Sequence, residues 1–276
     1  MKIFLFLVFA LFLQADEIKK NSLVISGATT IQSIIEELAK PYFDAMKIEL
    51  VVEGGGSEGG LKKLKEKMAD IAMVSRDLSQ EEKSRYEYVT IAYDAVAIIH
   101  TNSEPNLTLT KEMLIKIYNG TIKECKEIGW KCDNITVISK AIDRGTLATF
   151  EAYTGLISPR HKNLPINVKL IRADAWEAES NINSLLWVCG LKNSIGYVSY
   201  GEAKRYQDMS YPIHISSIEG VFPSIETIKN RHYPLIRELN LVWNKDNKKA
   251  AQFIEWSKNQ LFKQTVEKLG FVAVER

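Results

Sequence analysis

This chain of 276 residues contains a glycine-rich stretch, Glu53–Gly60, whose residues are well suited to binding a ligand. It holds five glycines and the hydroxyl of Ser57, and it lies between an apolar strand-like run and a helix-like run. The first N–H groups of a helix lack partners within the helix, and the helix dipole adds partial positive charge there. Such a loop is therefore suited to holding an oxyanion. The alternative is a flexible glycine turn in which Ser57 caps the helix.

Two further turns have the same position between a strand and a helix. Gly27–Thr30 carries two hydroxyls, and Lys140–Thr146 carries two cations and a hydroxyl. A third strand-like run ends in Ser75 and Arg76. Because ligands of parallel α/β sheets bind at the carboxyl ends of the strands, we expect these turns to meet at one edge and form an anion site.

Short apolar runs alternate with helical patterns along most of the chain, which predicts an α/β fold with a largely parallel sheet. The run Val89–Thr101 is interrupted by Asp94 and is long enough to pass from one lobe into another. We expect the run Ile195–Tyr200 to lead back to the first lobe. A strand at Leu239–Trp243 and two helices within 248–269 complete the pattern.

The N-terminus has the features of a secretory signal. Lys2 precedes the apolar run Ile3–Leu13, which is shorter than the about 20 residues that span a bilayer. We expect cleavage after Ala15, so that residues 1–15 are removed and the mature protein is exported and soluble. The net charge of +2 excludes a strong nucleic-acid signature. The four histidines show no ligand spacing, which predicts neither a metal nor another cofactor.

Three cysteines remain in the mature chain. Cys125 and Cys132 flank a loop-like segment, and in an oxidising compartment they could form a disulfide that leaves Cys189 free. The alternative is three unpaired cysteines with structural roles.

Several short motifs occur together in an order and spacing that resemble the substrate-binding proteins of bacterial phosphate ABC transporters. The resemblance covers nearly the whole mature chain. It implies a periplasmic protein, monomeric, that captures inorganic phosphate and delivers it to an inner-membrane permease. The matching motifs are Ser26–Gln32, Gly54–Ser57, Ala69–Arg76, Gly145–Thr146 with Phe150, Ile195–Ser199, Tyr233–Leu235 and Leu269–Val272.

The resemblance also implies a fold and a domain organisation. The fold would be the two-lobed α/β periplasmic-binding-protein fold of type II, in which each lobe is a mostly parallel sheet flanked by helices. Two hinge strands would join the lobes. Lobe I would comprise residues 18–93 and 220–276, and lobe II would comprise residues 94–219.

Matching the family motifs residue by residue assigns phosphate ligands to turns of both lobes. Hydroxyl and N–H donors at helix N-termini would hold the anion, with one or two cations nearby. The expected ligands are Thr29, Thr30, Ser57, Ser75, Gly145 and Thr146, to which we add the cations Lys140 and Arg144.

Several of these residues have simpler interpretations. Thr29 and Thr30 could cap the helix that follows them, and we favour Asp143 as the N-cap of the helix that begins near Thr146. Arg76 is expected to pair on the surface with an acidic neighbour, Asp77 or Glu81.

Two departures from the family pattern bear on specificity. The family motif of lobe II has arginine where this chain has Lys140 and serine where it has Arg144, and lysine cannot make the two-pronged contact of arginine. Some members also carry an aspartate at the position of Ser75, which accepts the proton of hydrogen phosphate. Sulfate, molybdate or tungstate are therefore alternative ligands. An enzyme acting on phosphate esters would need a nucleophile with a base, or a metal cluster, and we find neither pattern.

Overall fold

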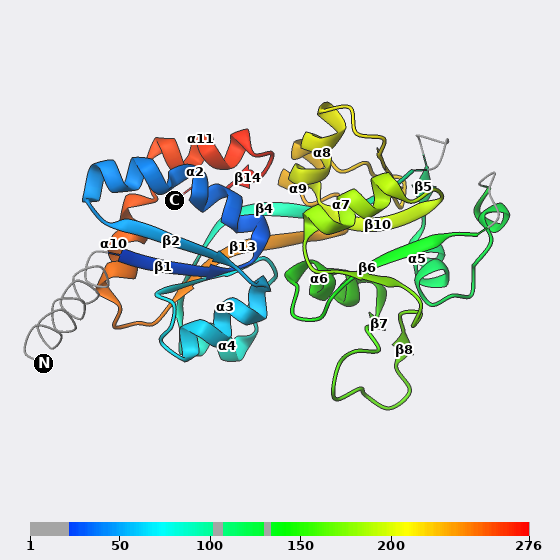
Figure 1. Ribbon diagram of the computed structural model, residues 1–276, viewed down its shortest axis with the longest axis horizontal. Coiled ribbons are helices and arrows are strands. Elements are labelled where there is room, and N and C mark those ends of the chain that lie inside the picture. The colour runs from blue at the N-terminus through cyan, green and yellow to red at the C-terminus, as the bar shows by residue number, and fades with distance from the viewer. Residues whose placement is uncertain (1–21, 102–106, 130–133, 276) are drawn as a thin grey trace, which may run out of the picture.

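The computed structural model describes residues 22–101, 107–129 and 134–275, which form two lobes side by side (Figure 1). One sheet runs through both lobes with the strand order β2-β1-β3-β13-β4-β10-β6-β9, and β11 and β14 also pair with β4. The predicted α/β class is confirmed, and the lobes share a single sheet rather than having one each. Two strands, β4 (Glu87–His100) and β13 (Ile236–Trp243), run between them.

The first lobe is built on three parallel strands covered by helices on both faces. α2 and α11 lie on one face, and α3 and α4 lie on the other (Figure 1). Its strands are β1 (Ser22–Gly27), β2 (Glu49–Gly54), β3 (Ile71–Val74) and the short β14 (Val272–Ala273). Its helices are α2 (Thr29–Met46), α3 (Gly56–Lys65), α4 (Gln80–Arg85), α10 (Lys248–Trp256) and α11 (Gln260–Lys268).

Side-chain alternation on β3 explains why the sheet of this lobe has two cores. Ile71 and Met73 pack in the core beneath α2, whereas Ala72 and Val74 pack in the core beneath α3. An apolar stripe of α2 is buried, at Ile31, Ile34, Ile35, Leu38 and Tyr42. Both faces of the first three strands are thus covered, as parallel strands require.

The second lobe packs helices against β10 and β6. Its strands are β5 (Thr108–Leu109), β6 (Thr136–Lys140), β7 (Leu156–Ile157), β8 (Lys169–Leu170), β9 (Trp176–Ala178), β10 (Ser194–Ser199), β11 (His214–Ile215) and β12 (Ser217–Ile218). Its helices are α5 (Lys111–Tyr118), α6 (Gly145–Thr154), α7 (Asn181–Gly190), α8 (Tyr200–Asp208) and the 3₁₀ turn η1 (Cys125–Ile128). The short helix α9 (Ile225–Lys229) packs against β4 and β14.

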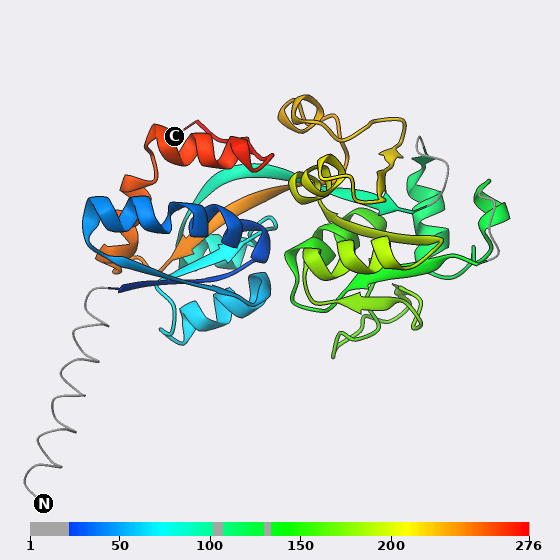
Figure 2. The ribbon, with the colours of Figure 1, turned by 45° about the horizontal axis from the view of Figure 1, so that its top comes forward.

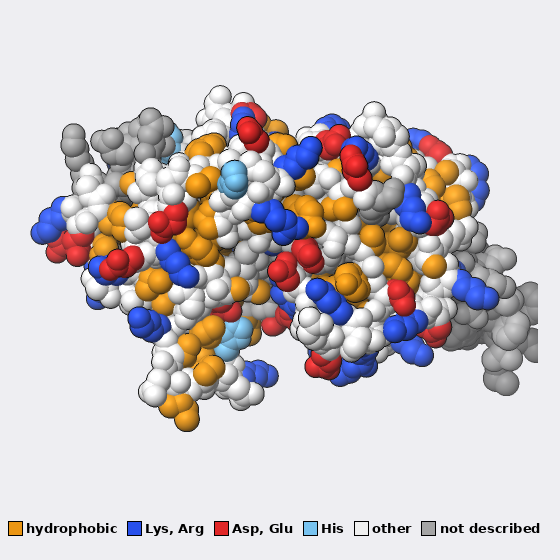
Figure 3. Space-filling model, turned by 180° about the vertical axis from the view of Figure 1, so that it is seen from behind, with side chains coloured by type: hydrophobic (Ala, Val, Ile, Leu, Met, Phe, Trp, Pro, Cys, Tyr) orange, Lys and Arg blue, Asp and Glu red, His pale blue; other side chains and the backbone are white. Residues whose placement is uncertain are grey.

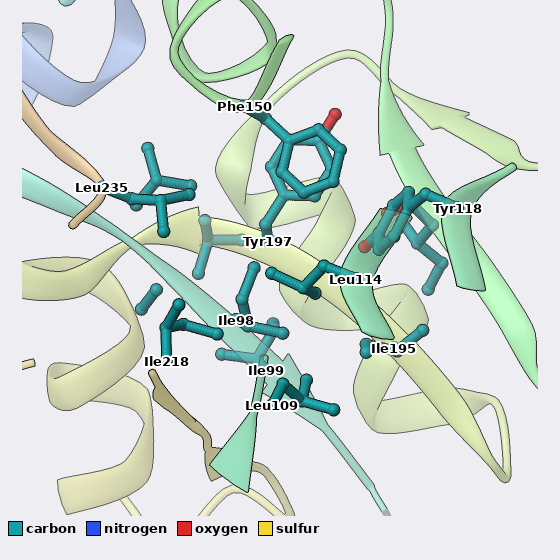
Figure 4. Packing of buried hydrophobic residues seen from close by; sticks show 14 of the residues in the cluster. Ile98, Ile99, Leu109, Leu114, Tyr118, Phe150, Ile195, Tyr197, Ile218 and Leu235 are labelled. Carbon is teal, nitrogen blue, oxygen red and sulfur yellow. The ribbon is translucent and has the colours of Figure 1, made fainter. Parts of the chain in front are cut away.

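An aromatic stack fixes α6 in the core of the second lobe (Figure 4). The ring of Phe150 on α6 is parallel to that of Tyr197 on β10, with the centroids 4.2 Å apart, and Tyr118 lies 4.6 Å from Phe150. All three side chains are fully buried. Because α6 follows the polar turn at Lys140–Thr146, this stack also holds that turn in place.

The two crossing strands are β4 and β13, which pair antiparallel and pass between the lobes (Figure 2). Their register places Arg237 opposite Asp94 and shifts between Leu239 and Asn240. The expectation that Ile195–Tyr200 leads back to the first lobe was wrong, because β10 stays beside the second half of β4 and α8 begins at Tyr200. The apolar run of β10 reflects its burial on both faces, and burial does not reveal which lobe a strand enters.

Two predictions on the chain's organisation stay predictions. The lobe boundaries at 93/94 and 219/220 are not sharp features, since β4 belongs to both lobes and Ile228 of α9 packs in the core of the second lobe. The signal peptide, residues 1–15, lies outside the described residues. Among the residues that are described, no helix is both long and apolar enough to span a membrane.

The cysteine prediction is met in part. Cys125 is buried and disulfide-bonded, and Cys189 is a free thiol. Cys132 lies outside the described residues, so its pairing with Cys125 stays a prediction.

The surface carries charges of both signs. On the face seen in Figure 3, lysine and arginine side chains are interspersed with aspartate and glutamate across both lobes. This mixed pattern matches the small net charge of the chain.

Candidate anion-binding site

A small polar cavity lies where turns of both lobes meet. Four helices begin at its wall: α2 and α3 from the first lobe, and α6 and α7 from the second. Helices α2, α3 and α6 have no side-chain hydrogen bond at their N-caps, so their first N–H groups are not capped by side chains. Four converging helix N-termini create positive potential at one point. The wall consists of Ala28, Thr29, Thr30, Gly56, Ser75, Lys140, Arg144, Gly145, Thr146, Ser180 and Asn181.

Seven of the eight predicted ligands lie on this wall, and the eighth, Ser57, lies directly behind it. The Ser57 hydroxyl is fully buried and accepts a hydrogen bond from the N–H of Ser75 at 3.1 Å. The structure thus brings together all eight predicted ligands, although their contact with a ligand stays a prediction. Asn181 and Ser180 join them from α7, a helix whose N-terminus had shown no distinctive motif.

The simpler interpretations of these turns were wrong in three cases. Ala28 rather than a threonine is the N-cap of α2, and Gly55 rather than Ser57 is the N-cap of α3. Arg144 rather than Asp143 is the N-cap of α6. Asp143 has a φ of 71°, and its carbonyl instead accepts a hydrogen bond from the N–H of Glu58 across the lobes. The threonine and serine hydroxyls are therefore free for other partners.

Two glycines let the lobes approach closely at the cavity. A Cβ on Gly145 would lie 2.5 Å from Ser75 Oγ and 2.7 Å from Ser57 Oγ. A Cβ on Gly56, whose φ is 80°, would lie 2.6 Å from the carbonyl oxygen of Asp143. Any side chain at these positions would hold the two lobes apart.

A buried arginine that sequence reasoning missed connects the turns. Arg237 on β13 is only 1% exposed, and its Nε and Nη2 donate to Asp94 Oδ2 at 3.1 and 2.8 Å. Its Nη1 also donates to Thr146 Oγ1 at 2.8 Å, and its Nη2 donates to Thr30 Oγ1 at 3.1 Å. Nη1 also donates to the carbonyl oxygen of Ser75, over a longer distance of 3.3 Å. One guanidinium thus joins hydroxyls from both lobes to a fully buried carboxylate.

The sequence held a signal for one half of this pair. Asp94 interrupts an apolar strand, and charged residues are almost never fully buried unless they are paired, so Asp94 predicts a cationic partner. Arg237 carries no such signal, because it stands beside Glu238 and before the predicted strand Leu239–Trp243.

Lys140 is buried on the second-lobe side of the cavity. Its Nζ donates to the carbonyl oxygen of Ser180 at 2.8 Å and to Ser184 Oγ at 2.5 Å. Burial lowers the pKa of Lys140 well below its usual value, and the carboxylate of Glu202 opposes that shift. Burial likewise raises the pKa of Glu202, which accepts a hydrogen bond from Asn181 Nδ2.

Arg144 lies on the cavity wall, and its Nη2 also forms an ion pair with Glu179 Oε2 at 2.5 Å. Arg76, by contrast, pairs with Glu58 at 2.5 Å and Glu82 at 2.8 Å. Arg76 thus pairs with acidic side chains, but the expected partners, Asp77 and Glu81, were wrong.

The described part of the chain contains no group of three or more His, Cys, Asp or Glu side chains placed to hold a metal ion. The groups on the cavity wall offer hydrogen bonding and positive charge, directed at one point between two lobes.

Proteins named for phosphate binding or phosphate transport resemble most of the chain. The phosphate-binding protein PstS of Borreliella burgdorferi is 29% identical over 257 residues, which cover 91% of this chain and 89% of the relative. PstS of Bacillus subtilis is 24% identical, with 95% and 83% covered. The structure of a putative phosphate ABC transporter substrate-binding protein from Clostridium perfringens, with bound phosphate, superposes with a TM-score of 0.80 at 26% identity, covering 92% of this chain and all of that one.

A family model described as a PBP superfamily domain matches residues 14–259. The resemblance to binding proteins of phosphate transporters and the two-lobed α/β fold are both confirmed by these relatives. The chain belongs to the PBP superfamily.

Proposed function

We propose that this protein captures inorganic phosphate between its two lobes and delivers it to an ABC permease in the inner membrane. After removal of the signal peptide it would act in the periplasm, as a monomer and without catalysis. The observation that carries the proposal is the convergence of four helix N-termini and the buried Arg237 on one interlobe cavity. Relatives named for phosphate binding, and a similar structure with bound phosphate, support it.

The donors at the site suit a small tetrahedral anion better than a planar or extended one. They approach from both lobes, on α2 and α3 from one side and on α6 and α7 from the other. An anion between them would be contacted by both lobes and would favour the closed arrangement. Because the ligand would bind only the folded state, it should also raise the melting temperature.

Isothermal titration of ligand-stripped protein with phosphate tests the proposal. We expect one phosphate per chain, and a loss of roughly tenfold to hundredfold in affinity for Thr30→Val, the range for one hydrogen bond to a charged group. Ser33→Ala on the same helix is the matched control, since the Ser33 hydroxyl bonds the carbonyl of Thr30 and does not line the cavity. It should leave the affinity unchanged.

Two outcomes would contradict the proposal. The first is no heat of binding with phosphate, sulfate, molybdate or tungstate. The second is steady turnover of a chromogenic phosphate ester by the purified protein, which would favour an enzyme.

A further inference from the structure

We propose that the loop between β7 and β8 is a membrane-contact site that binds the surface of a bilayer containing anionic phospholipid. This β7–β8 loop, residues 158–168, lies on the second lobe, and none of its residues lines the anion cavity. The inference therefore goes beyond the proposed function and concerns a different surface of the molecule, with a lipid as its partner.

The β7–β8 loop projects from the body of the second lobe. In Figure 1 it extends below β7 and β8, and in Figure 3 the protrusion at the lower left carries hydrophobic side chains at its end. The base of the loop is fixed, because β7 and β8 pair in parallel and the N–H of Ser158 donates to Glu151 Oε1 at 2.7 Å. The loop is thus a protrusion that is held at both ends.

The apolar side chains of the loop are exposed and belong to no hydrophobic core. Ile166 is 93% exposed, more than any other large apolar side chain that the structure describes, and Leu164 is 39% exposed. Pro165 lies between them and is also exposed. Because proline fixes its own φ, this segment has less conformational freedom to lose when it binds a partner.

Cations without acidic partners flank these apolar side chains. Lys162 and Lys169 are exposed, and within the described ranges neither side chain forms an ion pair or a hydrogen bond. Arg160 pairs with Glu177 at 3.0 Å but stays 61% exposed. The sequence from Ser158 to Leu170 has no acidic residue, although the whole chain nearly balances 36 Lys and Arg against 34 Asp and Glu. The loop therefore carries a local excess of positive charge.

The surface of an anionic bilayer is complementary to this combination of groups. Negative headgroups lie outside the hydrocarbon, so a loop that enters the interface places its cations among the headgroups and its apolar side chains against the acyl chains. Lysine suits this position, because its stem packs on apolar surface while its ammonium group stays in the polar layer. A stable protein complex instead buries about 800 Å² on each partner, and a narrow convex loop presents few side chains for such an interface.

Co-sedimentation of the mature chain with vesicles tests the proposal. The anionic vesicles contain phosphatidylglycerol and phosphatidylethanolamine, and vesicles of phosphatidylcholine are the neutral comparison. We expect the apparent Kd for lipid to be at least about tenfold lower with the anionic vesicles. Binding should weaken between about 0.1 M and about 1 M NaCl, because the Debye length falls from about 10 Å to about 3 Å.

Two double variants separate the apolar and the charged contributions. Leu164→Ser/Ile166→Ser removes the exposed apolar side chains, and Lys162→Glu/Lys169→Glu reverses the flanking charges. Each should raise the apparent Kd for anionic vesicles at least about fivefold.

Matched controls carry the same kinds of change on other surfaces. Met209→Ser removes an apolar side chain that is 62% exposed after α8. Lys245→Glu/Lys248→Glu changes the net charge as much as the lysine variant of the loop does, at exposed positions of the first lobe. Both controls should bind vesicles within about twofold of the wild type. Circular dichroism checks that every variant is folded.

Three outcomes would overturn the membrane contact. The first is equal binding to anionic and neutral vesicles, and the second is an equal loss of binding in the lysine variant of the loop and in its control. The third is no binding to either kind of vesicle, which would favour a protein partner for the loop. Phosphate titration of the same variants should give the wild-type affinity, so the proposed function stands or falls on a separate measurement.

Discussion

Removing Arg237 alone should destabilise the protein far more than removing Arg237 together with Asp94. Arg237→Met leaves the Asp94 carboxylate, which is 0% exposed, without the two hydrogen bonds that it now accepts. An uncompensated buried charge costs about 3–5 kcal/mol of the free energy of unfolding. Asp94→Val should cost a similar amount, because it leaves the guanidinium buried without a counter-ion.

The double variant Asp94→Val/Arg237→Met replaces the pair by two apolar side chains. Replacing a buried ion pair in this way is often neutral or stabilising, so we expect the double variant to lie within about 2 kcal/mol of the wild type. The coupling energy between the two positions should then exceed about 3 kcal/mol, at the upper end of measured values. Anion binding should not recover, because Arg237 also polarises the hydroxyls of Thr30 and Thr146.

Urea unfolding followed by circular dichroism in phosphate-free buffer measures the stabilities, and isothermal titration measures binding. Arg160→Met is the matched control, since Arg160 pairs with Glu177 at 3.0 Å on the surface and should cost at most about 1 kcal/mol. The reasoning would be refuted if the double variant lost as much stability as the two single variants lose in sum. So would a double variant that is less stable than either single variant.

Three further changes test other parts of the structure. Arg144→Ala should weaken anion binding by about 1.5–3 kcal/mol in titration with the fold intact, whereas an unchanged affinity would mean that Arg144 serves only its pair with Glu179. Gly145→Ala should reduce phosphate affinity at least about tenfold because the new Cβ would lie 2.5 Å from Ser75 Oγ; wild-type affinity would contradict the close approach of the lobes. Burial, with a smaller effect from His214, lowers the pKa of His100 to about 4. In the unfolded chain His100 binds a proton below about pH 6.5, whereas in the folded chain it does so only below about pH 4. The free energy of unfolding should therefore decrease by roughly 2–3 kcal/mol as the pH falls from about 6.5 to about 4. Urea midpoints at several pH values should show this fall in the wild type and a flatter curve in His100→Phe.

The local features of the site could be predicted from the sequence because each depends on a short stretch of chain. Glycines and hydroxyls between a strand and a helix indicate a helix N-terminus, and the carboxyl ends of parallel strands meet at one edge. For that reason Ser57, Ser75 and Thr146 were placed correctly, although they come from different strands and lobes.

Features that depend on pairing between distant segments were not predicted. The role of Arg237 requires knowing that β13 lies opposite β4, and neither strand's own sequence specifies that register. For the same reason β10 was wrongly predicted to cross between the lobes. Its apolar sequence predicts that the strand is buried, but not which other elements pack against it. The N-cap of α6 was also misplaced, because the left-handed backbone at Asp143 is set by contact with the other lobe.

The position of β13 within the shared sheet also determines the order in which the chain can assemble. In the second lobe, β4 pairs with β10 and β11, β10 pairs with β6, and β6 pairs with β9, so the strands of this half of the sheet are complete at Ile215. In the first lobe, β13 pairs with both β3 and β4, and the side chains of Thr90 and Asn240 bond across 150 positions of sequence.

Such distant pairing carries a large loop-closure cost, and it leaves β3 and the first half of β4 with open edges until the last part of the chain is available. A nascent chain can therefore pair the strands of its second lobe while the sheet of its first lobe is still unfinished. Because Arg237 lies on the strand that closes the first lobe, the binding site is among the last parts of the molecule to form.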